Sequence, residues 1–229
     1  MTFLSRLTLK RTPSAHALNA LLNPSDDARR IDAHHRLIWT AFAGDGEAKR
    51  DFLWREDAGG RFLVLSPRRP ASAELFEEPE IKEFAPDLRP GERLAFLLRA
   101  NATRTVKTDR IAPNGKRERE HRDVVMELLR PVPRDARADQ RMELAQMAGH
   151  AWLESIGSRS GFTVEVARAS AYRVLEPPGR KQHLRFGILD LEGQIAVADP
   201  GKLVAHLALG FGRAKAFGCG LMLIRKAVG

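Results

Sequence analysis

The feature that most constrains the fold is the order of strand-like and helix-like patterns, because this order is similar in both halves of the chain. Residues 3–10 alternate apolar and polar side chains, as a half-buried strand does, and residues 25–42 place apolar side chains at helical spacing. A hairpin with a glycine turn is predicted over 51–67, and an apolar strand that becomes cationic over 93–107. The first half therefore reads strand, helix, strand, strand, irregular segment, strand.

The second half repeats most of this order after a polar, turn-rich segment and the separator "PVPRD". Asp199 is predicted to cap a helix that has Pro200 at its first position. The predicted elements are a helix, two strands, a second helix and a closing strand, at residues 136–157, 162–175, 184–197, 199–210 and 217–227. Both halves then carry the order of a split β-α-β unit. The prediction is an α+β fold of two tandem ferredoxin-like (RRM-like) domains, at residues 1–130 and 131–229.

Charge indicates the class of partner. The 229 residues hold 38 Lys and Arg against 29 Asp and Glu, a net charge of +9. Such an excess favours a polyanion, because basic side chains release the counterions condensed on phosphates. A codon bias towards arginine would produce the same composition without any such partner. The placement of the cations must therefore decide between these two explanations.

The composition gives no support to a cysteine-based site or to a membrane-spanning segment. The single cysteine, Cys219, excludes a disulfide framework and a thiolate metal cluster, and it is expected to be a small packed thiol. We therefore expect no metal and no cofactor. The sequence has no apolar run of membrane-spanning length, and its opening residues alternate as a strand does. We accordingly expect a cytoplasmic protein.

Residues 210–220, "GFGRAKAFGCG", combine four glycines with two cations. Glycines let a backbone approach a ligand closely and leave N–H groups available for phosphate oxygens. Arg213 and Lys215 would attract that phosphate. The alternative is a plain connection between a helix and a strand, with Gly210 ending the helix and Gly218 and Gly220 allowing close packing.

Two adjacent histidines, His34 and His35, lie in the predicted first helix. An imidazole passes protons near neutral pH, which suits general acid or base catalysis. Neighbouring helix positions point about 100° apart, so both rings cannot reach the same phosphate, and they are poorly placed to share a metal. Arg36, beside His35, could bind a phosphate and its transition-state charge, or could simply be exposed.

Three stretches together resemble one family, the CRISPR repeat-processing endoribonucleases of type I-E Cascade systems, often called CasE. "HRLIWTAF" with "RDFLWRED" looks like the family's catalytic helix and first hairpin. "LRPGERLAFLLRANATRTVK" is similar to a strand of the family, and "LEGQIAVADPGKLVAHLALGFGRAKAFGCGLMLI" to its terminal glycine-rich loop. The resemblance covers nearly the whole chain in order.

This resemblance implies tandem ferredoxin-like domains that bind the stem-loop of CRISPR repeat RNA. It implies cleavage at the 3′ base of the stem without a metal, by attack of a ribose 2′-OH that leaves a cyclic phosphate and a 5′-OH. It also implies that the chain associates with other Cascade subunits. His35 matches the family's histidine, since it stands four residues before Trp39 as that histidine stands before its helix tryptophan.

Basic residues elsewhere are the candidates for RNA contact. The predicted RNA-binding set combines a track on the first half, a hairpin on the second half and the glycine loop, namely Arg99, Arg104, Lys107, Arg180, Lys181, Arg185, Gly210, Gly212, Arg213, Lys215, Gly218 and Gly220. By resemblance, the second-half hairpin enters the major groove of the RNA stem. Contacts there read shape and phosphate spacing more than sequence.

The sequence departs from the family at one position that matters for the chemistry. Where the family often has a tyrosine, three residues before its histidine, this chain has Asp32, and its only tyrosine is Tyr172 in the second half. A carboxylate beside the histidine would repel a phosphate unless it turned away. Two further functions stay open, a non-catalytic RNA-binding module and a structural Cascade subunit.

Overall fold

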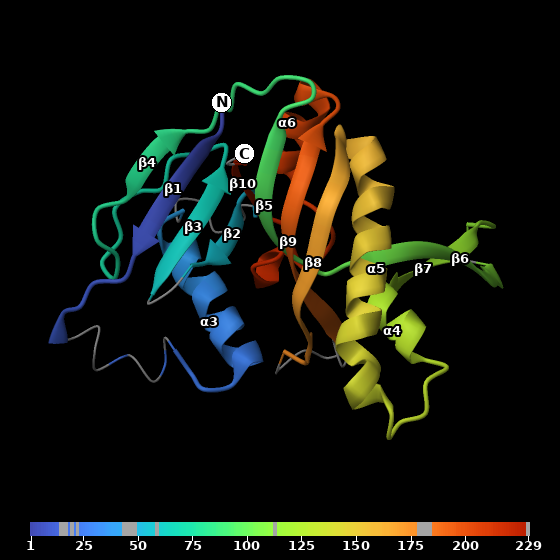
Figure 1. The fold of residues 1–229 in the computed structure, drawn as a ribbon. Helices are drawn as coiled ribbons and strands as arrows, with labels where there is room; N and C mark the ends of the chain where they lie inside the picture. Colours follow the sequence, from blue (N-terminus) through green and yellow to red (C-terminus); the bar gives the residue numbers. More distant parts are fainter. Residues whose placement is uncertain are drawn as a thin grey trace.

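The computed structural model describes residues 1–13, 18, 21, 23–42, 50–57, 60–111, 114–177 and 185–227. It contains two four-stranded antiparallel sheets and a separate two-stranded hairpin. The sheets stand side by side, and the hairpin projects from the second one (Figure 1).

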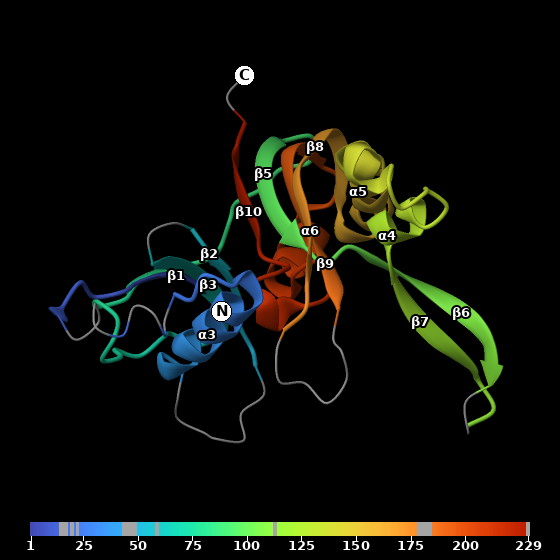
Figure 2. The same cartoon turned by 90° about the horizontal axis from the view of Figure 1, so that it is seen from below.

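The first sheet has the strand order β2-β3-β1-β4. Helix α3 (Asp27–Thr40) lies between β1 and β2 in the chain and covers one face of this sheet (Figure 2). This is the order of a ferredoxin-like unit, except that residues 67–79, between β3 and β4, contain no helix. The four strands are β1 (Phe3–Thr8), β2 (Leu53–Glu56), β3 (Arg61–Ser66) and β4 (Glu80–Glu83).

The second sheet has the order β10-β5-β9-β8 and carries both helices of a ferredoxin-like unit. Asp199 accepts a hydrogen bond from the Lys202 N–H and so caps α6, with Pro200 at the start of the helix, as predicted. The two helices are α5 (Arg137–Ser160) and α6 (Pro200–Leu209), and the four strands are β5 (Arg93–Ala100), β8 (Phe162–Leu175), β9 (Phe186–Val197) and β10 (Met222–Lys226).

Sheet membership corrects one part of the sequence analysis. The strand predicted to close the first unit is β5, and it pairs with β9 and β10, so it is the first strand of the second unit. The first sheet is completed instead by the short strand β4, which pairs with β1. A division of the chain by sheets therefore falls between Glu83 and Arg93, whereas the predicted division follows residue 130.

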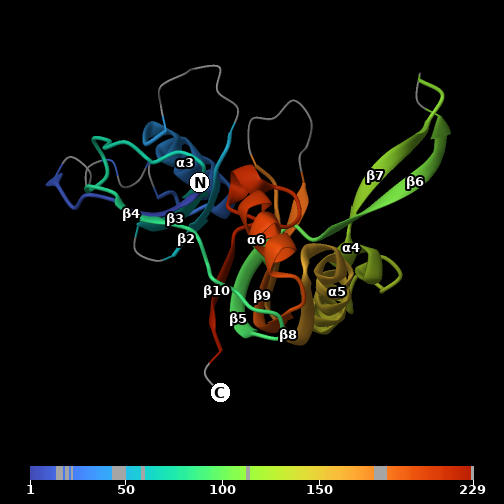
Figure 3. The same cartoon turned by 90° about the horizontal axis from the view of Figure 1, so that it is seen from above.

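The end of the strand predicted over 93–107 and the polar, turn-rich segment after it form an antiparallel hairpin of β6 (Thr103–Ile111) and β7 (Arg117–Asp123). The hairpin leaves the second sheet at β5 and returns to α4 (Val124–Leu129), which packs beside α5 (Figure 3). The Asp123 carboxylate caps α4 by accepting hydrogen bonds from the Val125 and Met126 N–H groups. The hairpin is thus an insertion between the first strand and the first helix of the second unit.

The hydrophobic core of the first unit includes residues from the second unit. Ile38 on α3, Trp54 on β2 and Phe62 on β3 are buried together in the first unit. Phe217 and Cys219, from the connection between α6 and β10, belong to the same cluster. The second unit has its own core between its sheet, α5 and α6. Among the helices that the structure describes, none is both long and apolar enough to cross a membrane.

Candidate functional site

The two histidines of α3 lie in different environments. Asp26 caps the helix by accepting a hydrogen bond from the Arg29 N–H, and Ile31, Ile38 and other apolar residues face the sheet. His34 falls on that buried face and is only 2% exposed. Its ring meets the Phe62 ring edge to face, with 4.9 Å between the two ring centroids. His35 is partly exposed. The choice of His35 as the histidine that can meet a ligand therefore fits its placement, whereas His34 is a core residue.

The His35 ring is held against two aromatic side chains. The Trp39 indole donates a hydrogen bond from Nε1 to His35 Nε2 over 3.2 Å, and the Phe52 ring centroid lies 6.1 Å from that of His35. An indole N–H can only donate, so Nε2 accepts here and carries a lone pair. In the neutral ring the proton then lies on Nδ1. His35 Nε2 is therefore a nitrogen that can accept a proton, on a partly exposed side chain of α3.

Asp32 is turned towards Arg36, one helical turn further on. Arg36 donates from its guanidinium to Asp32 over 2.7 Å, and its side chain is 79% exposed. The carboxylate is therefore paired with a cation and need not face a phosphate beside His35. Tyr172 takes no part in this site, because it is buried in the second core and its hydroxyl donates to Asp123 over 3.1 Å. Burial and the Asp123 carboxylate raise the pKa of the Tyr172 hydroxyl.

The glycine loop between α6 and β10 has four glycines with positive φ. Gly212 has φ +72°, and a Cβ added there would lie 2.7 Å from the Asn101 carbonyl oxygen. Gly218 and Gly220 have φ +73° and +95° and lie against Trp54 and Phe211. Gly210 ends α6. The alternative explanation, close packing, therefore accounts for much of this loop.

Several N–H groups of the loop are also used within the protein, which corrects the expectation that they are left for phosphate. The Phe211 N–H donates to the Gly220 carbonyl and the Gly220 N–H to the Arg99 carbonyl. The Arg213 and Phe217 N–H groups likewise donate to backbone carbonyls, of Asn101 and Ala214. The loop is pre-formed by these bonds, and its cations are the groups that can reach outward.

The loop meets the helix that carries His35. Its short 3₁₀ turn, η1 (Lys215–Phe217), packs against α3 and β2, and the Trp54 indole donates to the Ala216 carbonyl over 3.3 Å. Lys215 Nζ donates to the Leu209 carbonyl over 2.6 Å, at the end of α6. Arg213 is exposed. His35 and Lys215 thus come from different units of the fold, and the elements that carry them, α3 and η1, meet at one seam.

Arg50, which the sequence analysis did not single out, lies in the same place. Its guanidinium carbon is 6.0 Å from the centroid of the Phe52 ring, the ring that also lies beside His35. Burial, and to a lesser extent the positive charge of Arg50, lower the pKa of Lys215. The pKa of Arg50 is also lowered, chiefly by burial. An anion bound beside Lys215 would offset the burial and the positive charge of Arg50 that lower its pKa.

The remaining predicted cations are spread over the second unit. Arg99, only 20% exposed, donates two hydrogen bonds to Asp190 and lies in the seam rather than on a surface track. Arg104 and Lys107 lie on the β6–β7 hairpin, on the far side of the second sheet from α3 (Figure 1). Arg185 forms an ion pair with Glu176. Arg180 and Lys181 lie outside the described residues.

Taken together, the seam offers one imidazole with a lone pair, two partly buried cations and a shell of aromatic rings. This arrangement can transfer a proton and can stabilise negative charge on a phosphate. Within the described ranges, no group of three or more His, Cys, Asp and Glu side chains is placed to hold a metal ion. Cys219 is fully buried, which raises the pKa of its thiol to about 12 and gives it the packing role that the sequence predicted.

The chain matches the family model described as "CRISPR associated protein" over residues 2–226. It belongs to this family. It is also 30% identical, over 225 residues, to the CRISPR-associated endoribonuclease Cse3 of Thermus thermophilus, with 89% of this chain and 96% of the relative covered. The resemblance to the CasE family of CRISPR endoribonucleases is therefore confirmed.

Solved structures of this family share the fold. Thermus thermophilus Cse3, bound to an RNA that represents a pre-cleavage complex, has a TM-score of 0.63 at 26% identity, with 98% of each chain covered. Cas6e from Escherichia coli K-12 has a TM-score of 0.60 at 20% identity, with 98% of this chain and 100% of the other covered. The α+β fold of two ferredoxin-like units is thus shared by CRISPR-associated proteins of two other sources.

Proposed function

We propose that this member of the CRISPR-associated family is an endoribonuclease that binds the stem-loop of CRISPR repeat RNA and cuts it at the 3′ base of the stem. The observation that carries the proposal is the packing of η1 against α3, which brings the turn that holds Lys215 against the helix that holds His35. The relationship to Cse3, a CRISPR-associated endoribonuclease, supports the same activity.

The reaction follows from the chemistry of RNA and the groups at the seam. The ribose 2′-oxygen attacks the adjacent phosphorus, the bond from phosphorus to the 5′-oxygen breaks, and a cyclic phosphate and a 5′-OH result. His35 Nε2 accepts the proton of the 2′-OH after parting from Trp39, or the protonated ring gives a proton to the departing 5′-oxygen. Neither role requires a metal ion, so we expect cleavage in the presence of a chelator.

The cations bind and orient the RNA in this proposal. Arg213 and Lys215 contact phosphates near the cut, and Arg50 and Arg36 stabilise the charge that develops on the attacked phosphate. The glycines of the loop hold the backbone in the form that presents these side chains. Arg185 and the residues 180–181 contact the stem, and Arg104 and Lys107 extend the basic surface.

The cell biology of the protein follows from the same relationship. Solved CRISPR RNA-guided surveillance complexes contain a chain with the same fold, at a TM-score of 0.56 and 18% identity. We propose that this chain keeps the processed RNA and joins other Cascade subunits in the cytoplasm. A purely structural Cascade subunit or a non-catalytic RNA-binding module would keep the binding surface but would not need a proton-transfer group at the seam.

The test is cleavage of a synthetic CRISPR repeat hairpin in excess EDTA. We expect one cut at the 3′ base of the stem, with a cyclic phosphate on the upstream product. A hairpin carrying 2′-deoxyribose before the scissile phosphate should bind equally well and remain whole, because the attacking oxygen is missing. Binding of the normal hairpin without any cut would refute the endoribonuclease and favour a binding module.

A further inference from the structure

The β6–β7 hairpin is the part of the structure that the seam does not use. It projects away from both sheets (Figure 3) and buries little apolar surface, with Ile111 61% exposed. Its strands are polar, and its described residues carry an excess of Lys and Arg over Asp and Glu. A hairpin of this kind adds little to a core, so a function at its surface is the simplest reason for its presence.

The strand register divides the hairpin into two faces. Side chains on one face are Thr105 and Lys107 of β6, opposite His121 and Arg119 of β7. Side chains on the other face are Arg104 and Val106, opposite Arg122 and Glu120. Two cations therefore face each other directly on each side, at Lys107 with Arg119 and at Arg104 with Arg122, and like charges in that position destabilise a hairpin.

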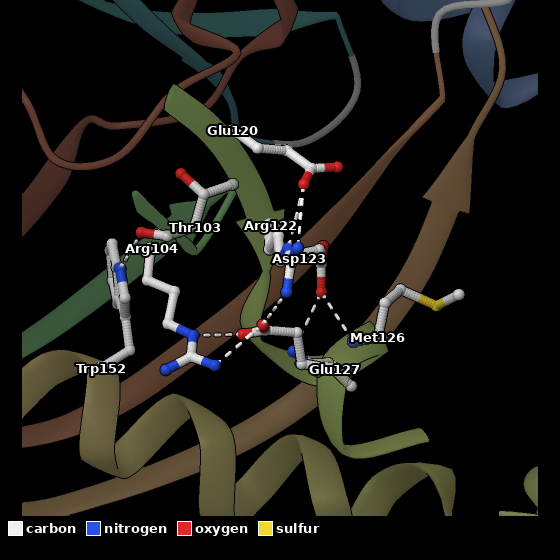
Figure 4. A network of polar contacts seen from close by, with 9 residues as sticks. Thr103, Arg104, Glu120, Arg122, Asp123, Met126, Glu127 and Trp152 are labelled. Carbon is white, nitrogen blue, oxygen red and sulfur yellow. Dashed lines mark hydrogen bonds and ion pairs between the residues drawn. The ribbon is translucent and has the colours of Figure 1, made fainter. Parts of the chain in front are cut away.

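One face neutralises its cations within the protein. Arg104 forms an ion pair with Glu127 of α4, and Arg122 lies 3.0 Å from Glu120 and 3.8 Å from Glu127. Figure 4 shows Arg104 and Arg122 converging on Glu127, with Glu120 on the other side of Arg122. Near the tip, Arg110 is paired in the same way with Glu118 over 3.2 Å. We call this the paired face.

On the opposite face, the central pair of cations lacks such partners. Lys107 and Arg119 are both exposed, and neither has an acidic partner within 4.0 Å among the residues described. The acid on this side, Asp123, accepts hydrogen bonds from the start of α4 and from Tyr172, so it does not offset them. Lys107 and Arg119 line an open hollow of about 760 Å³ together with Asn114, Lys116, Arg117 and Glu118. In this lining Glu118 is paired with Arg110, and Arg117 lies 3.8 Å from Asp109, so in the described part of the chain the charges without an acidic partner are those of Lys107, Lys116 and Arg119. We call this the open face.

We propose that the open face of the β6–β7 hairpin binds phosphates of the RNA at a place remote from the cut. The ligand chemistry is a polyanionic backbone, because an opposed pair of unpartnered cations gains most from charge that bridges both. The inference rests on the proposed function for the identity of the RNA. The hairpin would then hold the RNA at a place separate from the seam.

The test compares two double variants that remove the same charge from the same hairpin. Lys107→Ala with Arg119→Ala changes the open face, and Arg110→Ala with Arg122→Ala changes cations that are already paired. Binding is measured by fluorescence anisotropy on a repeat hairpin made uncleavable by 2′-deoxyribose, both as a bare stem-loop and with single-stranded flanks. The two RNAs distinguish contact with the stem from contact with a flank.

The open-face variant is expected to bind about tenfold more weakly, and its dependence of log K on log salt should lose about 1.5 in slope, as for two phosphate contacts. The paired-face variant should change binding less than about twofold. Cleavage at saturating RNA should be equal to wild type in both. Equal weakening by both variants, or no weakening by either, overturns the inference. If wild type binds but never cuts, the proposed function fails while the comparison of the two faces still decides this inference.

Discussion

The two ferredoxin-like units differ in how completely their sheets are covered, and the difference explains where the site lies. The second unit has two helices on its sheet, α5 and α6, and a closed core of its own. Among the elements that the structure describes in full, α3 is the one helix on the first sheet, and the core there is completed by Phe217 and Cys219 from the second unit. The first unit, which has fewer helices on its sheet, therefore supplies His35. The second unit supplies the apolar side chains that complete the first core and the cations of the glycine loop. Catalysis should accordingly depend on the assembly of the two units.

The largest effect should come from the histidine that the first unit exposes. His35→Ala is expected to lower the rate of cleavage by ~10²–10⁴-fold, because it removes proton transfer, and to leave RNA affinity within about twofold. Single-turnover cleavage at saturating RNA and anisotropy at equilibrium would measure the two effects separately.

His34→Ala is the matched control, since the two residues are adjacent and differ in burial. Its ring packs on Phe62 inside the core, so the change should lower the melting temperature and leave the rate of the folded protein near wild type. If His34→Ala stopped cleavage in a folded protein and His35→Ala did not, the assignment of the histidine would be reversed.

The next effect concerns the ion cluster where the second unit faces the first. Asp190 accepts hydrogen bonds from Arg99 and Arg173, and Arg173 lies 3.8 Å from Asp27 of α3. Burial would raise the pKa of Asp190, but the bonds and charges of these arginines outweigh it and hold the pKa below its usual value. Asp190→Asn should lower the free energy of unfolding at pH 7 by about 3–5 kcal/mol, because two partly buried cations lose their acid.

The pH dependence of that loss has a definite sign. A carboxylate whose pKa is lowered in the folded state contributes stability above its unfolded value of ~3.9, and this contribution is lost as the pH falls further towards the folded pKa. Wild type and Asp190→Asn should therefore converge below about pH 4 in urea unfolding curves. Glu165→Gln, which breaks the exposed Arg93 ion pair, serves as control and should show a much smaller gap at pH 7.

Elements of the fold could be predicted from the sequence where they depend on local patterns, and not where they depend on contacts between residues far apart in the chain. Periodicity alone located α3, α5, α6 and the first hairpin, because each is a local pattern. It could not assign β5, since the partners that make it a strand of the second sheet, β9 and β10, come about a hundred residues later. The short strand β4, Glu-Ile-Lys-Glu, has too little apolar pattern to be recognised.

The site was predictable to the same extent. The apolar stripe of α3 left His35 as the exposed histidine, and the resemblance to a family favoured the same residue. Arg50 gave no signal, because it lies outside any helix or strand and becomes significant only when the loop brings Lys215 near it. The loop N–H groups were predicted to be available, but their use by Asn101 and Arg99 carbonyls depends on tertiary contacts that no local pattern reveals.

A smaller effect should separate packing from binding in the glycine loop. Gly212→Ala places a Cβ 2.7 Å from the Asn101 carbonyl oxygen, while Gly91→Ala at a similar φ of +80° meets nothing within 4 Å. Each change costs about 1 kcal/mol for the left-handed backbone. Gly212→Ala should cost more by the clash and also weaken RNA binding, as measured by thermal unfolding and anisotropy. Equal stability and equal affinity in the two variants would mean that the loop conformation is not needed.

The smallest effect should come from Arg36, whose charge is already shared with Asp32. If Arg36 binds the attacked phosphate, Arg36→Ala lowers the cleavage rate only about three- to tenfold, because an exposed guanidinium is well screened. Asp32→Ala then has the opposite sign, since it releases Arg36 from its ion pair and removes a negative charge near the RNA. A double variant that cleaves at the rate of Arg36→Ala alone would show that Asp32 acts only through Arg36. Were Asp32→Ala to slow cleavage as well, the pair would be positioning α3, and the phosphate would be held by the cations of the second unit alone.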